Sequence, residues 1–266
     1  DEIRILIRTR MSKHSKWAKI KRKKGVADVK RSAVFTKLTN NVTIAVKEGG
    51  GGDPTMNFKL RLAVDAARAQ NVPKENIERA IERGLGKGNG AELEQLVFEG
   101  YGPGKVAVIV EVTTDSRNRS VSELKHAFAV ADGAMGGPGS VSWQFARKGV
   151  VRIPLTLTLS PEGRGNSDEL ELTLIDAGAD DIHTDHDNDD DHDILTITTP
   201  MENLKRLSDA VATSGLTVDE AAIEWIPKET VAVSDPEAQE KIADFLNELE
   251  DREDVTGVFT NANLAS

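Results

Sequence analysis

Residues 106–119 read VAVIVEVTTDSRNR, and this stretch decides the fold class. Valine recurs at every second position from 106 to 112, which is the period of a β-strand with an apolar face. Asp115 or Ser116 can then cap a helix that runs through Ala131. Strand and helix alternate on a short cycle along the rest of the chain. This alternation predicts small α+β sandwiches with one-sided sheets.

Downstream of this stretch, residues 140–145 are expected to form a strand with Val141, Trp143 and Phe145 on one face. The same periodicity predicts further strands and helices. The strands are expected over 150–153, 194–198, 220–226 and 255–260, and the helices over 169–177, 202–213 and 237–250.

Upstream, the period is helical. A short helix is expected from Ser15, and a longer one over residues 28–47. Two more helices should follow, and the glycine-rich residues 84–90 should link this block to the rest of the chain. The inward residues expected on the last three helices are Val34, Phe35, Leu38, Val42, Ala45 and Val46, then Leu62, Ala66 and Ala69, then Ile77, Ala80 and Ile81.

The charge of the chain is divided along its length. Residues 11–90 hold 18 Lys and Arg against 7 Asp and Glu, whereas residues 91–266 hold 13 against 35. A basic front on an acidic body is the pattern of a polyanion binder, because each neutralised phosphate releases condensed counterions. The acidic body should repel the same polyanion and limit how the protein docks.

The densest basic cluster lies at the front and continues into the long helix. We predict that phosphates are bound by Lys13, His14, Lys16, Trp17, Lys19, Lys21, Arg22, Lys23, Lys24, Lys30, Arg31 and Lys37. A solvated helix surface is the alternative, but like-charge repulsion disfavours it unless a partner relieves the charge. Trp17 could stack on a base, although its spacing with Ile20 favours a core position.

Enzymatic and metal sites are disfavoured by the residue pattern. The chain has no cysteine, no nucleophile elbow and no phosphate-binding glycine loop of the expected spacing. His183, His186 and His192 lie among many aspartates in residues 180–193, but their spacing matches no zinc or calcium motif. We interpret that segment as an exposed acidic turn, and we expect neither a metal nor a cofactor.

Two stretches stand apart from this organisation. Residues 1–10 precede Met11 and are interpreted as an upstream extension, since their four apolar residues are too few for a secretory signal. Residues 155–167 are interpreted as a surface insertion. No apolar run is long enough for a transmembrane helix, so no membrane partner is expected.

Several segments together resemble the YebC/PmpR family, which includes the mitochondrial translational activator of cytochrome c oxidase. The matching segments are Ser12–Lys21, Phe35–Leu38, Pro73–Ile81, Thr114–Arg119, Gly139–Trp143 and Ile226–Lys228. The resemblance runs from about residue 11 to the C-terminus. Lys13 departs from the glycine usual in the family, and the insertion at 155–167 is absent from the family pattern.

The resemblance implies an α+β protein of three domains. A basic helical domain over 11–90 is followed by two small ferredoxin-like α/β domains, one inserted in the other. The discontinuous domain takes residues 91–146 plus 221–266, and the inserted domain takes 147–220.

The resemblance also implies a non-enzymatic cytoplasmic protein, either a DNA-binding transcriptional regulator or a translation factor that acts at the ribosome on RNA.

Lysine outnumbers arginine in the first cluster, which favours phosphate contact over base readout. Arg117, Asn118 and Arg119 form either a second nucleic-acid contact or part of a helix cap. A protein-protein adaptor that docks through the acidic body is the competing class. The oligomeric state is not predicted.

Overall fold

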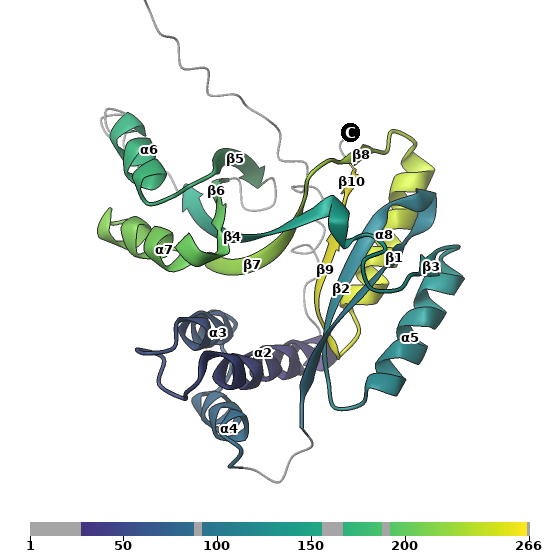
Figure 1. The fold of residues 1–266 in the computed structure, drawn as a ribbon, viewed down its shortest axis with the longest axis horizontal. Helices are drawn as coiled ribbons and strands as arrows, with labels where there is room; N and C mark the ends of the chain where they lie inside the picture. The colour runs from purple at the N-terminus through teal and green to yellow at the C-terminus, as the bar shows by residue number, and fades with distance from the viewer. Residues whose placement is uncertain (1–27, 88–91, 156–166, 188–191, 265–266) are drawn as a thin grey trace, which may run out of the picture. The chain divides into compact units, whose positions relative to one another are not determined.

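The computed structural model describes residues 28–87, 92–155, 167–187 and 192–264. These residues fold into three N-terminal helices followed by an α/β region with two antiparallel sheets (Figure 1). The predicted α+β class is therefore confirmed. No described helix is long and apolar enough to cross a membrane.

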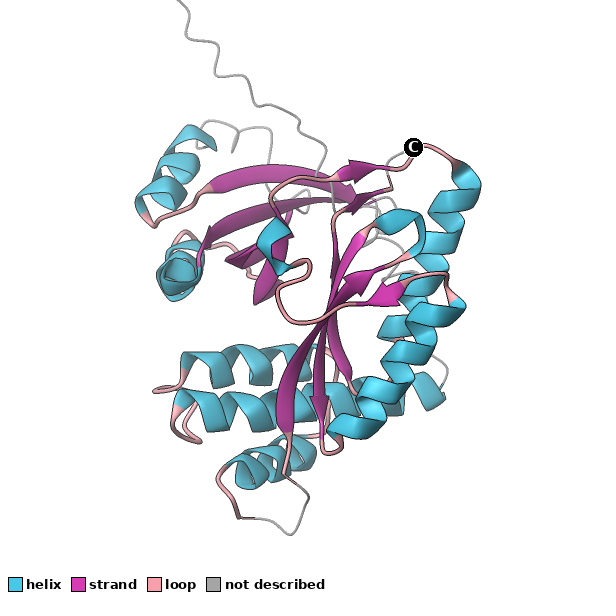
Figure 2. Cartoon of the chain, turned by 45° about the vertical axis from the view of Figure 1, so that its right-hand side comes forward, coloured by secondary structure: helices cyan, strands magenta, loops and turns pink. Residues whose placement is uncertain are grey.

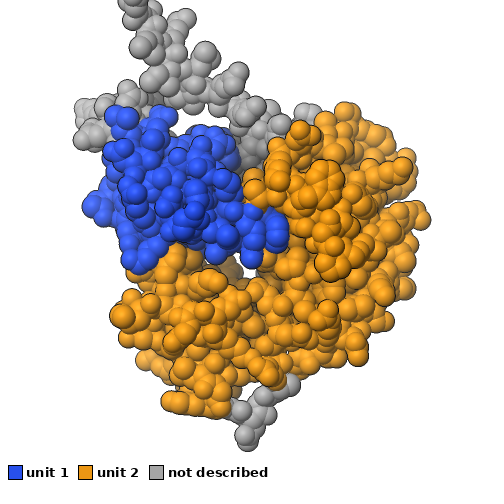
Figure 3. Space-filling model, viewed as in Figure 1, with its two compact units in different colours: residues 1–23, 147–225, 263–265 blue, residues 24–146, 226–262, 266 orange. Residues whose placement is uncertain are grey.

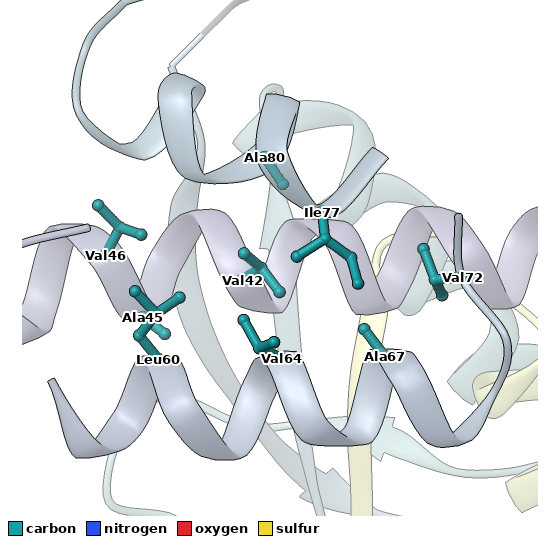
Figure 4. Packing of buried hydrophobic residues seen from close by; sticks show 9 residues of the cluster. All are labelled: Val42, Ala45, Val46, Leu60, Val64, Ala67, Val72, Ile77 and Ala80. Atoms are coloured by element: carbon teal, nitrogen blue, oxygen red, sulfur yellow. The ribbon is translucent and has the colours of Figure 1, made fainter. Parts of the chain in front are cut away.

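The three N-terminal helices pack around one aliphatic core. They are α2 (Asp28–Gly49), α3 (Phe58–Ala69) and α4 (Lys74–Gly84). The core contains Val42, Ala45, Val46, Leu60, Val64, Ala67, Val72, Ile77 and Ala80 (Figure 4). Of the inward residues expected on α2 and α4, all but Val34 belong to this core or pack against it.

The expected inward face of α3 is wrong. Leu60, Val64 and Ala67 point into the core, whereas Ala66 and Ala69 are exposed. The cause lies at the start of the helix, where buried Asn57 caps α3 by accepting a hydrogen bond from the Leu60 backbone N–H at 3.0 Å. The Asn57 amide also donates to the carbonyl of Ala45 in α2, at 2.9 Å. The cap therefore sets which face of α3 meets α2.

The first sheet belongs to the same compact unit as these helices, which comprises residues 24–146 and 226–262 (Figure 3). Its strand order is β3-β1-β2-β9. The strands are β1 (Glu94–Tyr101), β2 (Ala107–Thr114), β3 (Ala134–Met135) and β9 (Val255–Thr260). Helices α5 (Arg117–Val130) and α8 (Pro236–Glu250) lie side by side on one face (Figure 2), and α2 contacts β2 and β9. Short 3₁₀ turns lie at Pro103–Lys105 and Ser142–Gln144.

The second sheet belongs to the other unit, which comprises residues 147–225 and 263–264 among those described. Its order is β5-β6-β4-β7, in a β-α-β-β-α-β chain order typical of ferredoxin-like folds. Its elements are β4 (Phe145–Leu155), α6 (Ser167–Asp176), β5 (Asp181–Asp187), β6 (His192–Pro200), a 3₁₀ turn (Met201–Asn203), α7 (Leu204–Thr213) and β7 (Glu220–Pro227). A two-stranded sheet pairs β8 (Val231–Ala232) with β10 (Ala262–Asn263). The exact three-domain boundaries stay a prediction.

Two expectations for local structure are wrong. Residues 181–187 form the edge strand β5, paired in register with β6, and are not a turn. Residues 142–144 form a 3₁₀ turn where a strand was expected, and this turn carries the Trp143 side chain to the surface while Val141 and Phe145 stay buried.

Candidate nucleic-acid interface

The predicted phosphate contacts fall into three groups in the structure. Residues from Lys13 to Lys24, Trp17 among them, lie outside the described residues. Lys30 and Arg31 lie in the first turn of α2. The side chains of the remaining predicted contacts are described; these residues are Lys37, Arg117, Asn118 and Arg119. Their neighbours show which of them form contacts within the protein and which are exposed to solvent.

Lys37 is engaged within the protein. Its ammonium group donates a hydrogen bond to the backbone carbonyl of Glu250, at the C-terminal end of α8. A lysine at this position also suits the partial negative charge of a helix C-terminus. Lys37 thus joins α2 to the α/β part of the same compact unit.

Arg119 is also engaged. Its guanidinium lies 3.0 Å from the Asp254 carboxylate and 3.1 Å from that of Asp115, with the side chain 49% exposed. The hydrogen bond that Arg119 donates to Asp254 and the charge of that carboxylate raise the pKa of Arg119, so the group stays fully charged. The two ion pairs join Arg119, in the first turn of α5, to Asp115 just before the helix and to Asp254.

Asp254 organises the whole β2–α5 junction. Its carboxylate, 16% exposed, accepts hydrogen bonds from the hydroxyls of Thr114 at 3.0 Å and Ser120 at 2.8 Å, besides Arg119. Its backbone carbonyl accepts from the Thr113 N–H at 2.8 Å. This aspartate is 135 positions beyond Arg119 in the chain. No local pattern in the sequence could have indicated it.

Arg117 and Asn118 occupy the first turn of α5 with exposed side chains. Arg117 forms no ion pair with another described residue, unlike Arg119. The helix-cap interpretation therefore concerns Ser116 and Arg119, whereas a nucleic-acid contact stays a prediction for Arg117 and Asn118. Ser116 is the N-cap residue, Arg119 fixes the junction, and Arg117 and Asn118 face solvent.

A polar cavity of about 560 Å³ lies beside this junction, between residues of α2, α4 and the α/β part of the same unit. Its charged lining residues are Arg83, Arg119, Asp115, Glu123, Glu253 and Asp254. Carboxylates outnumber arginines there, so the interior of the cavity disfavours phosphate. Arg117 does not line it, which leaves Arg117 outside this acidic environment.

Four basic side chains on the described N-terminal helices form ion pairs with carboxylates. The pairs are Lys47–Glu92 at 2.9 Å, Lys59–Glu48 at 2.7 Å, Arg68–Asp65 at 3.5 Å and Lys74–Glu78 at 3.5 Å. By contrast, residues 11–27 contain seven Lys and Arg and no Asp or Glu. In the sequence, the basic residues of the N-terminal region that have no carboxylate nearby along the chain are therefore densest between Lys13 and Lys24.

The described part of the histidine- and aspartate-rich segment, residues 181–187, forms a strand of the second sheet. His183 lies in β5 with its Nδ1 3.7 Å from the Asp181 carboxylate. Among the described residues, no group of three or more His, Cys, Asp or Glu side chains gathers as a metal site would require.

Known protein families and structures match this chain along almost its whole length. Residues 15–87 match the model described as the TACO1/YebC protein N-terminal domain, and residues 93–262 match the TACO1/YebC second and third domain. A probable transcriptional regulatory protein of Chloroflexus aurantiacus is 43% identical over 256 residues, covering 96% of this chain and 97% of the relative. One from Thermotoga petrophila is 45% identical over 251 residues, covering 94% and 93%. The crystal structure of a conserved hypothetical protein from Aquifex aeolicus has a TM-score of 0.79 at 37% identity, covering 93% of this chain and 96% of that one.

Proposed function

Because the chain belongs to the TACO1/YebC family, we propose that it is a non-enzymatic, nucleic-acid-binding regulator of gene expression that acts in the cytoplasm. Relatives that match nearly end to end are named probable transcriptional regulatory proteins. The observation that carries the proposal is the run of seven basic residues without a carboxylate in residues 11–27. Such a run attracts phosphates because binding releases their counterions.

The chemistry of the run sets the kind of recognition. Lysine is a flexible point charge that contacts phosphate without fixing a base edge, whereas arginine can bind guanine through two hydrogen bonds. Six of the seven basic residues are lysines. We therefore propose affinity with strong salt dependence and weak sequence preference. Structured RNA, the ribosome or loosely selected duplex DNA would each satisfy this chemistry.

Arg117 and Asn118 supply a second, smaller contact in this proposal. Their side chains are exposed at the N-terminus of a 14-residue helix, whose partial positive charge favours phosphate. The Asp254 network holds the start of that helix in place. Arg119 then acts as a positioning residue, and its removal should disturb the junction.

The test compares binding of the purified protein to ribosomes, structured RNA and duplex DNA across a salt series. The key variant replaces Lys21, Arg22, Lys23 and Lys24 with Ala. A matched control removes four basic residues that already pair with carboxylates: Lys59, Arg68, Lys74 and Lys241. The key variant should lose most binding, and the control should retain it.

The three ligands distinguish the two regulatory roles. Preference for ribosomes or RNA would support a translation factor. Preference for duplex DNA with marked selection of particular sequences would support a transcriptional regulator and would show that the argument for weak specificity is wrong. Binding to no nucleic acid would favour an adaptor that docks through the acidic residues 91–266.

A further inference from the structure

Trp143 is held at the surface although its neighbours are core residues. Its side chain is 66% exposed, while Val141 is fully buried and Phe145 is 4% exposed. The 3₁₀ turn at Ser142–Gln144 breaks the alternation that would have buried the indole. An exposed tryptophan gives up the large stabilisation that burial of its ring would provide.

The loop that carries Trp143 is fixed by a buried carboxylate. Glu99, only 7% exposed, accepts hydrogen bonds from the backbone N–H groups of Gly139, Val141 and Ser142, each at 2.8 Å. Burial alone would raise the pKa of Glu99, but these donors outweigh it and lower the pKa below its ordinary value. The ionised carboxylate therefore orders the backbone on the N-terminal side of Trp143.

The indole and the residue after it are fixed as well. The Trp143 Nε1–H donates to the Ser140 carbonyl at 3.2 Å, which uses the edge of the ring and not its π-face. The ammonium of Lys228 donates to the Trp143 carbonyl at 2.8 Å. The Lys228 backbone N–H donates to the Gln144 carbonyl, also at 2.8 Å. The ring is thus preorganised, and the ammonium group of Lys228 lies at the backbone carbonyl of the same residue.

The charge around this loop differs from that of the acidic body. No Asp or Glu occurs between Asp132 and Glu162, although residues 91–266 hold 35 of them. Glu99, whose carboxylate accepts hydrogen bonds from the loop, is itself buried. The segment that carries Trp143 therefore adds no exposed carboxylate of its own, which reduces the repulsion of a polyanion there.

From these observations we propose that Trp143 is a stacking platform for an unpaired base of single-stranded nucleic acid, with Lys228 near the backbone phosphates. Aromatic side chains in a positive environment bind single strands in this way, because every base has a π-face. A base inside a duplex is already stacked and is not available to the ring. The proposal rests on the proposed nucleic-acid binding and adds a preference for unpaired segments.

The test measures affinity for a single-stranded oligouridine and for a blunt RNA duplex of equal length. Trp143→Ala should weaken binding of the single strand about 5- to 150-fold, the range for loss of one stacked base, and should leave duplex binding unchanged. Trp143→Phe should retain most of the affinity. Leu172→Ala, which truncates another strongly exposed apolar side chain, is the matched control. In a background with Trp17→Phe and Trp225→Phe, oligouridine should also quench the fluorescence of Trp143.

The outcomes separate this proposal from the broader one. Unchanged single-strand binding by Trp143→Ala, with wild-type protein binding both ligands, overturns the stacking platform alone. Equal losses for single strand and duplex would also overturn it. If the wild-type protein binds neither ligand, the proposed nucleic-acid function fails and the platform fails with it. Thermal unfolding of each variant shows whether the fold is retained.

Discussion

Replacing Glu99 with Gln should destabilise the protein and change how its stability depends on pH. In the wild type, one carboxylate oxygen accepts from Val141 and Ser142, and the other accepts from Gly139. Glutamine keeps an acceptor for two of these donors. It places an amide N–H₂ against the third donor and leaves that donor unsatisfied.

The size of the effect follows from these three contacts. A hydrogen bond to a charged group contributes about 1.5–3 kcal/mol, and a neutral one contributes roughly half as much. Losing one charged bond and halving two others should cost about 3–6 kcal/mol at pH 7. The effect should be confined to pH values at which Glu99 is ionised.

The sign of the pH dependence is set by the lowered pKa of Glu99 in the folded protein. A depressed carboxyl pKa gives stability that is fully present above the unfolded-state value, near 4.5, and is lost as pH falls through the folded value. The difference between wild type and Glu99→Gln should therefore be constant from pH 6 to 8 and should shrink below about pH 4.5.

Urea unfolding followed by circular dichroism, repeated from pH 3 to 8, measures this difference. Gly137→Ala in the same loop is the control, because an added Cβ there meets no atom within 4 Å. Equal stability of Glu99→Gln and wild type at pH 7 would refute the reasoning. A difference of the same size at pH 3 and pH 7 would refute it too.

Substitutions at three further positions test core packing and one ion pair. Phe128→Ala should cost about 3–5 kcal/mol, since this ring is fully buried and lies edge-to-face with Phe245 at 5.0 Å; a loss under 1 kcal/mol in urea unfolding would contradict this. Gly100→Ala should cost about 1–3 kcal/mol, because its Cβ would lie 2.6 Å from the Phe128 ring; a wild-type melting temperature would disprove the clash. Arg152→Gln should cost about 3–5 kcal/mol by stranding the half-buried carboxylate of Glu224, whereas Arg152→Lys should restore part of the loss, and equal effects of both would exclude the charge argument.

Elements with regular periodicity could be predicted from the sequence. The spacing of Val42, Ala45 and Ile77 placed the helical core correctly, because one buried stripe recurs every three or four residues. The valine alternation placed β2, and Ser116 marked the start of α5. In each case the local pattern and the tertiary environment require the same residue types.

Elements whose surroundings come from distant parts of the chain could not be predicted from the sequence. Strand β1 was not predicted, because its outer residues are exposed and only Glu99 and Gly100 are buried. Strand β5 carries aspartates that suggest a loop, yet an edge strand tolerates such charges.

In the candidate site, too, local patterns could be predicted from the sequence and contacts between distant segments could not. The charge split indicated the basic front, and the Thr114–Arg119 segment indicated the second contact. The separate roles of Arg117 and Arg119 depend on Asp254, which approaches from beyond α8. The exposure of Trp143 depends on Glu99, a residue 40 or more positions earlier. These contacts join segments that have no pattern in common.

The central claim is that phosphates are bound by the lysines and the arginine of residues 11–27, a stretch without Asp or Glu. The most direct test is the slope of log affinity against log salt concentration for duplex DNA, compared between wild type and the variant with Ala at 21–24. If all four residues contact phosphates, the slope should become shallower by about 3–4, while the matched control at Lys59, Arg68, Lys74 and Lys241 keeps the wild-type slope. An unchanged slope for the 21–24 variant, or an equal reduction in both variants, would contradict the claim.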